Sequence, residues 1–335
     1  MSFRRAFTLV EVLISIGIFL TISTVMLGAL FGATEAFRRG EASRQAGDEA
    51  TVVLSALQED LTRAVPVRLR DGKPALEWGQ MYASVTDAAG NCDLRVVIEN
   101  SDHSQVRWVS TGAGTQTVVG VRKRVRWFVQ ADATDPTDPT KAALMREEAE
   151  LGDNGAVVGT PVANVITRGC LHFGVWIELA QAHRTVTLGS DGPLINWESS
   201  TAPVLPFADD PGTAPNDPMP LDTSVQVSTG AAMIWPLPNA LRVSLVLTGG
   251  GRYATQGTVI RSLGSDIRIG GIKALSTVTG SLLRIGNEWV RYDDFRNNLL
   301  TGVKPAQLRS TAHTISAQET ALAGQFFSVV VALPR

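Results

Sequence analysis

The most apolar stretch of the chain lies near its N-terminus, where no charged residue occurs from Val12 to Thr34. As a helix with a rise of 1.5 Å per residue, these residues extend about 34 Å, which is enough to cross a hydrocarbon layer of roughly 30 Å. Arg4 and Arg5 lie on the short segment before this run. The positive-inside rule therefore predicts that the N-terminus stays in the cytoplasm and that the residues after the helix are exported.

Helical periodicity continues beyond the apolar stretch, because residues 35–64 contain no proline and repeat apolar residues at helical spacing. We predict one long helix over residues 7–64, with its transmembrane part at 7–34. Pro66 is expected to end this helix. Leu54, Leu57 and Leu61 form an apolar stripe that is too short for a coiled coil, so we expect it to face a sheet.

From Trp78 onward, apolar and polar residues alternate, which is typical of β-strands. The main strand candidates are residues 94–98, 105–109, 117–119, 121–129, 165–179 and 235–247. Within 121–129, Arg122, Arg124 and Arg126 share one face. We interpret this basic face as an edge strand that its charges protect from self-pairing. The alternative is a surface that binds an acidic partner or lipid headgroups.

Tight-turn signals mark the C-terminal part of the chain. A Gly-Asn pair at 286–287 divides one alternating run, and an Asn-Asn pair at 297–298 precedes another. Residues 326–333 form the last strand candidate. We predict a β-rich globular domain over residues 65–260 and a small all-β module over residues 261–335. This module either contacts a partner or packs on the preceding sheet.

The overall composition is that of a globular protein. The chain has 335 residues, of which 44% are hydrophobic, and both charge signs are present. This balance disfavours collagen-like, coiled-coil and wholly disordered chains. The formal net charge is -2 and the isoelectric point is about 6.1, so no broad cationic field exists to hold phosphates. We therefore expect no nucleic acid partner.

Few residues offer catalytic or metal-binding chemistry. Cys92 and Cys170 are the only cysteines, and they form either one disulfide in an oxidising compartment or two buried thiols. The four histidines form no HExxH pair, and the acidic residues of the proline-rich stretch 199–224 lack EF-hand spacing. Phosphate-binding loops and nucleophile elbows have no matching motif. We predict no metal, no cofactor and no enzymatic activity.

Three interpretations of the N-terminal segment differ at Glu11. A cleaved secretory signal should carry no carboxylate in its apolar region and should end at a small-residue cleavage site. A simple membrane anchor has no use for Glu11, because a charge at the bilayer centre costs about 2.5–3.5 kcal/mol, although a carboxylate near the interface avoids much of this cost. The third interpretation assigns Glu11 a function, and it rests on the residues that surround Glu11 in the sequence.

A short basic leader, a small residue and the pattern Phe-Thr-Leu-x-Glu precede the apolar helix, at Arg4, Arg5, Ala6, Phe7, Thr8, Leu9, Val10 and Glu11. This arrangement resembles the signature of type IV prepilins and type II secretion pseudopilins. The family usually has glycine where this chain has Ala6. The resemblance implies that residues 1–6 are a leader, that a prepilin peptidase cleaves between Ala6 and Phe7, and that the new amine of Phe7 is then methylated.

This processing explains Glu11 in physical terms. Cleavage creates a positive amine at Phe7, four residues before the Glu11 carboxylate. The carboxylate neutralises that amine within its own helix or, as the family is thought to do, on a neighbouring subunit. Because an unpaired charge in lipid is costly, pairing favours insertion beside an assembled helix at a fixed axial offset. We therefore predict that Glu11 is an assembly residue.

Two more segments resemble the minor pseudopilin J group and related minor pilins. Residues 54–64 match the pattern LxxLxxDLxxA at the end of the long helix. Residues 235–247 contain a tryptophan and a Leu-Pro turn before an alternating strand. The resemblance covers roughly residues 4–258. Within the first segment, we expect Asp60 and Arg63 to form a solvated pair.

The resemblance implies an α+β, pilin-like fold, in which the long helix packs on antiparallel sheets. It implies a minor pseudopilin that primes the tip of a type II secretion filament. The alternative is a minor pilin of a type IV pilus, used in adhesion, motility or DNA uptake. A third class, a membrane-tethered binding or enzymatic ectodomain, predicts an intact N-terminus.

The resemblance also implies partners and a location. The partners are other pseudopilins or pilins, which bind through the N-terminal helix, together with the prepilin peptidase, the inner-membrane assembly platform and the membrane. The location is the bacterial inner membrane, crossed once, with a cytoplasmic N-terminus and a periplasmic C-terminal domain.

Overall fold

The fold is α+β, with one long apolar helix and mostly antiparallel sheets. The structure is a computed structural model that describes residues 9–65, 69–70, 73–74, 81–110, 114, 116–153, 155–178, 226–228, 231–233, 240–248, 255–272, 275, 281–308 and 310–333. The proline-rich stretch 199–224 and the start of the predicted segment 235–247 lie outside the described residues.

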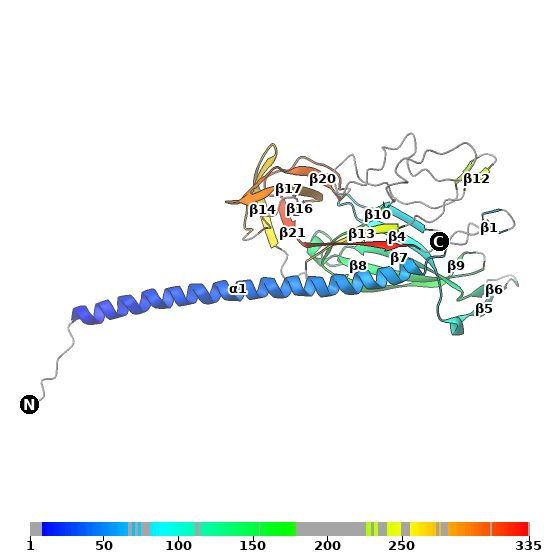
Figure 1. Cartoon of the computed structure of the whole chain (residues 1–335), viewed down its shortest axis with the longest axis horizontal. Coiled ribbons are helices and arrows are strands. Elements are labelled where there is room, and N and C mark those ends of the chain that lie inside the picture. Colours follow the sequence, from blue (N-terminus) through cyan, green and yellow to red (C-terminus); the bar gives the residue numbers. More distant parts are fainter. Residues whose placement is uncertain are drawn as a thin grey trace, which may run out of the picture.

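The helix α1 runs without interruption from Leu9 to Thr62. It ends four residues before Pro66, because a proline disfavours helical backbone at the preceding residue and cannot donate a backbone hydrogen bond. After the helix, Ala64 forms a β-bridge with Ile98 and leads the chain into a sheet. The first half of α1 extends away from the globular part, as Figure 1 shows.

A five-stranded antiparallel sheet receives the C-terminal half of α1. Its strands are β3 (Met81–Val85), β4 (Cys92–Glu99), β7 (Arg122–Gln130), β8 (Ala143–Leu151) and β9 (Val157–Arg168). Their order is β3-β4-β7-β8-β9. The alternating runs predicted at 94–98 and 121–129 are therefore both confirmed as strands. The single run predicted at 165–179 is divided at Gly169 between the end of β9 and a second strand, β10 (Cys170–Glu178).

The basic strand β7 is an interior strand, so our interpretation of it as an edge strand is wrong. Its neighbours β4 and β8 supply carboxylates that pair with Arg126, one of the three arginines of the basic face. Asp93 accepts hydrogen bonds from Arg95 (2.7 Å) and Arg126 (2.9 Å), and Glu147 lies 3.8 Å from Arg126. Burial by itself raises the pKa of Asp93, but the hydrogen bonds from Arg95 and Arg126 outweigh this effect and lower the pKa.

A hairpin of β5 (Arg107–Ser110) and β6 (Gln116–Val119) separates β4 from β7 along the chain. The short 3-10 helix His103–Gln105 precedes it, and a second one, Pro139–Lys141, precedes β8. Gly120 connects β6 to β7 with φ +90°, and a Cβ at this position would collide with the carbonyl of Gln105. The hairpin position thus depends on a glycine at this point.

A three-stranded antiparallel sheet, in the order β10-β13-β22, closes the core on another side. Its strands are β10 (Cys170–Glu178), β13 (Ala240–Leu247) and β22 (Gln325–Ala332). Buried residues of both sheets and of α1 form one cluster. The last strand of the chain therefore pairs with β13 and not with the strands of the predicted 261–335 module.

Eight further strands, which lie between β13 and β22 in the sequence, form one antiparallel sheet. They are β14 (Thr255–Leu263), β15 (Asp266–Gly270), β16 (Ser281–Ile285), β17 (Glu288–Tyr292), β18 (Asp294–Arg296), β19 (Leu299–Thr301), β20 (Lys304–Gln307) and β21 (Thr320–Ala323). Both predicted turns are confirmed, because β16 pairs with β17 around 286–287 and β18 with β19 around 297–298. Asn297 and Asn298 adopt φ values of 50° and 62°.

This eight-stranded sheet packs against the rest of the globular part. Trp289 and Leu322 share a buried cluster with Leu171 of β10 and Val246 of β13. The buried Arg284 donates a hydrogen bond of 3.2 Å to the Leu171 carbonyl. Of the two roles left open for the C-terminal strands, packing on the preceding sheet is the one observed.

Two short pairs complete the described strands, namely β1 (Leu69–Arg70) with β2 (Lys73–Pro74) and β11 (Gln226–Ser228) with β12 (Ala231–Met233).

Candidate assembly interface

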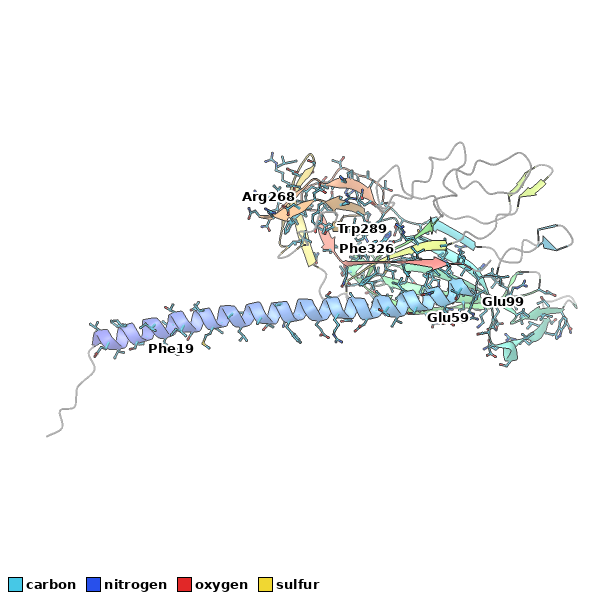
Figure 2. The ribbon with its side chains drawn as sticks, in the orientation of Figure 1. Phe19, Glu59, Glu99, Arg268, Trp289 and Phe326 are labelled. Carbon is cyan, nitrogen blue, oxygen red and sulfur yellow. The ribbon has the colours of Figure 1, made fainter. Side chains whose placement is uncertain are left out.

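The candidate interface is the N-terminal half of α1. Ala6 and Phe7, the predicted processing site, lie outside the described residues. Glu11 is in the first turn of α1. From Leu9 to Phe37 the large apolar side chains of the helix are exposed, and Figure 2 shows Phe19 among them. This segment is long and apolar enough to cross a membrane, by length and composition.

Three threonine hydroxyls within the apolar segment form hydrogen bonds inside the helix. The hydroxyl groups of Thr21, Thr24 and Thr34 each donate a hydrogen bond of 2.8–2.9 Å to the carbonyl four residues earlier. In a lipid environment an unsatisfied hydroxyl would cost free energy, because no water is present to bond it. These threonines are therefore compatible with a lipid-facing helix.

Gly28 and Gly32 form a GxxxG pair that our sequence predictions did not use. A Cβ at either glycine would meet no atom within 4 Å. In membrane helices, small residues at this spacing allow a second helix to approach closely. The signal was present in the sequence, and the exposure of this surface adds that no other part of the described chain covers it.

A charged segment separates the exposed half of α1 from the docked half. Arg44 pairs with Glu41 (2.8 Å) and with Asp48 (3.7 Å) along the helix surface. The hydrogen bond from Arg44 lowers the pKa of Glu41. Glu41 and Arg44 thus lie between the apolar segment and the first buried helix residue, Ala46.

The docked half of α1 buries a stripe at helical spacing. Its buried members are Ala46, Ala50, Val53, Leu57 and Leu61. The predicted sheet-facing role of Leu57 and Leu61 is confirmed, and both side chains are fully buried. Leu54 is only partly buried at the margin of the same cluster. Near the start of the docked half of α1, Ser43 donates a hydrogen bond of 3.1 Å to the side chain of Gln325 on β22.

Asp60 fixes the end of α1 on the sheet, so the predicted solvated pair of Asp60 and Arg63 is wrong. Asp60 is only 2% exposed and accepts two hydrogen bonds of 2.7 Å from Arg146 of β8. The indole N–H of Trp127 on β7 donates a third, of 2.9 Å. Arg63 instead donates to the Glu99 carbonyl at 2.6 Å and pairs with Glu59 at 3.4 Å. Figure 2 places Glu59 and Glu99 at this end of the helix.

The network around Asp60 extends across the sheet. Arg146 also pairs with Glu148, which in turn lies 3.3 Å from Lys123. The hydrogen bonds that Arg146 donates to Asp60 raise the pKa of Arg146. Burial by itself raises the pKa of Glu148, but Arg146 and Lys123 outweigh it and lower the pKa. A buried, fully bonded ion pair of this kind specifies one helix position, because any slip leaves charges unpaired.

The other predicted residues are not brought together as a reactive site. Cys92 and Cys170 are both buried, and they are thiols that form no disulfide with one another. Burial raises the pKa of the Cys170 thiol to about 12, which keeps it unreactive. Among the residues that the structure describes, no group of three or more His, Cys, Asp or Glu side chains could hold a metal ion.

Comparisons with known proteins add no assignment. No protein-family model matches this chain, and no curated protein matches it.

Proposed function

We propose that the chain is a minor pseudopilin, a subunit that assembles with related subunits through the N-terminal half of α1 and assists protein export. The observation that carries this proposal is the division of one helix into two halves. The half after Ala46 packs on the sheets of its own chain, whereas the half up to Thr34, which is uncharged from Val12 onward, is exposed. An exposed, uncharged half-helix suits lipid and other helices.

The chemistry of assembly rests on Phe7 and Glu11. When the leader is removed, the amine of Phe7 is positive and enters the apolar phase with the Glu11 carboxylate close by. Either charge alone is costly in lipid, so a neighbouring subunit that pairs with it lowers the free energy of the assembled state. This pairing selects one axial offset between neighbouring helices, since other offsets leave a charge without a partner.

The docked half of α1 has a complementary task in this proposal. The ion pair of Asp60 with Arg146 holds the globular part at one position on the helix. The offset chosen at Glu11 then also fixes where the globular part lies relative to its neighbours. The open surface at Gly28 and Gly32 permits close helix packing between these two points.

The experiment is an exchange of Glu11 for Gln in cells that contain the other pseudopilins, with cross-linking between N-terminal helices as the readout. Gln keeps the size of Glu but not its charge, so we expect the cross-linked species and protein export to fall at least about tenfold. Glu41→Gln is the matched control, because Glu41 is exposed on the same helix beyond the uncharged segment. Normal cross-linking and export by Glu11→Gln would refute the proposed role.

A further inference from the structure

The strand β9 forms an unusually bare edge of the five-stranded sheet. It lies at the end of the order β3-β4-β7-β8-β9 and pairs with β8 alone among the described strands. From Val157 to Thr167 it carries no charged residue. Val162 and Val165 are 61% and 46% exposed. Natural sheet edges usually carry charges or prolines that prevent another strand from pairing with them, and this edge lacks charges over most of its length and contains one proline, Pro161.

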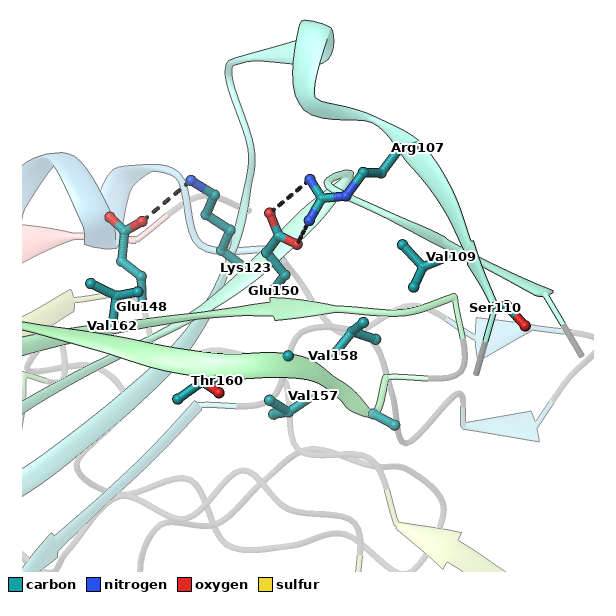
Figure 3. Close-up of a pocket in the computed structure, with 12 residues that line it drawn as sticks. Arg107, Val109, Ser110, Lys123, Glu148, Glu150, Val157, Val158, Thr160 and Val162 are labelled. Atoms are coloured by element: carbon teal, nitrogen blue, oxygen red, sulfur yellow. Dashed lines mark hydrogen bonds and ion pairs between the residues drawn. The ribbon is translucent and has the colours of Figure 1, made fainter. Parts of the chain in front are cut away.

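A groove of about 1020 Å³ runs beside β9, beneath the β5–β6 hairpin. Figure 3 shows Val157, Val158 and Val162 of β9 lining it, with Val109 of β5 above. The hairpin is held over the sheet by the bidentate ion pair of Arg107 with Glu150, at 2.7 and 3.4 Å. The groove therefore combines an open strand edge with apolar walls.

The charges in this groove already neutralise one another. Arg107 pairs with Glu150, and Lys123 pairs with Glu148. A charged occupant would have to break one of these pairs or lie against them without compensation, and both alternatives cost free energy. An uncharged occupant avoids this cost and can bury its side chains against the valines.

A second copy of this chain does not fit the edge well. All strand pairs described in the chain are antiparallel, and β9 extends alongside α1 in Figure 1. Antiparallel pairing of two β9 strands would point the two α1 helices in opposite directions. Two copies anchored in one membrane with the same orientation could not pair in this way.

We propose that β9 and the groove beside it bind an extended, uncharged segment of another polypeptide, which adds to the five-stranded sheet as a sixth strand. The backbone groups of β9 supply the hydrogen bonds, except for the nitrogen of Pro161, which carries no proton, and the groove accepts alternate side chains of the incoming strand. This interaction goes beyond the helix-mediated assembly proposed above and uses a different surface of the molecule.

The test uses the full chain in detergent and a fluorescent peptide of about eight residues that alternates valine and threonine. Fluorescence anisotropy measures binding, and hydrogen exchange of residues 157–168 measures protection of the β9 amides. We expect saturable binding together with slower exchange in β9. Methylation of alternate peptide nitrogens should weaken binding at least about tenfold, because it removes strand pairing but keeps the side chains. Glutamate in place of threonine should weaken it as well.

Substitutions on the protein locate the site. Val162→Lys should weaken peptide binding about tenfold, since it places a charge on an edge that must be desolvated. Ile260→Lys is the control, because Ile260 is 55% exposed on β14, which has neighbours on both sides. Absence of saturable binding, equal binding of the methylated peptide, or an unchanged affinity of Val162→Lys would each overturn the proposal. Dimerisation that Val162→Lys abolishes would instead identify a second copy as the occupant and would also overturn it.

Discussion

The two halves of α1 belong to one continuous helix but differ in what surrounds them. The half before Thr34 has exposed apolar side chains, whereas the half after Ala46 buries an apolar stripe and ends at a buried carboxylate, Asp60. Helix propensity alone does not separate the halves, because both are free of proline. The difference is the partner, since one half is stabilised by its own chain and the other remains available to lipid or another helix.

The largest predicted effect comes from removing the carboxylate that ends the docked half. Asp60→Ala leaves Arg146 and the Trp127 N–H without their buried acceptor, so we expect a loss of about 3–5 kcal/mol in the free energy of unfolding. Denaturant unfolding of the full chain in detergent measures it. Glu59→Ala is the control, because the Glu59 side chain is 70% exposed and its pair with Arg63 should contribute less than about 1 kcal/mol. Equal losses for Asp60→Ala and Glu59→Ala would remove the basis for the comparison.

The apolar stripe gives the next prediction. Leu57→Ala should cost about 2–5 kcal/mol, because Leu57 is fully buried and the substitution leaves a cavity. Leu27→Ala, in the exposed half where Leu27 is 53% exposed, should leave unfolding of the globular part unchanged. Chemical denaturation followed by tryptophan fluorescence distinguishes them. A Leu27→Ala loss as large as that of Leu57→Ala would show that the two halves are not energetically separate.

Acid should weaken the sheet that receives the docked half. The pKa values of Asp93 and Glu148 are lowered in the folded state from 3.8 and 4.5, so the unfolded chain binds more protons in this range. The stability from their ion pairs is complete above about pH 5 and is lost as the pH falls through the folded-state pKa values. Unfolding at several pH values tests this. Asp93→Asn should reduce the acid dependence, and an unchanged dependence in that variant would contradict the assignment.

The smallest effect concerns Cys170, which lies in the core that the docked half of α1 covers. Because burial raises the pKa of its thiol to about 12, the native chain should leave Cys170 unmodified by iodoacetamide at about pH 8. The denatured chain should react, and peptide mass spectrometry reports both results. Rapid modification of native Cys170 would mean that the core opens readily.

Local sequence patterns predicted much of the fold. The proline-free apolar periodicity predicted α1 and its sheet-facing residues Leu57 and Leu61, and alternation with turn residues predicted the strands around 286–287 and 297–298. These features depend on residues close in the chain, so their physical causes are visible in the sequence.

The errors came from long-range contacts. Asp60 looked like half of a solvated pair because its partners, Trp127 and Arg146, are 67 and 86 residues away. The basic strand β7 looked like an edge because strand order is not encoded in alternation. For the same reason, the return of β22 to β13 could not be read from the last residues. The candidate interface needed less of this information, because one exposed helix carries it.

The measurement that tests the account most directly is the intact mass of the native chain, purified from cells that contain a prepilin peptidase, with sequencing of its N-terminus. We predict a mature chain that starts at Phe7 with a methylated amine, and an unprocessed chain when the peptidase is absent. A native chain that keeps Met1 although the peptidase is present and active would contradict the proposed function.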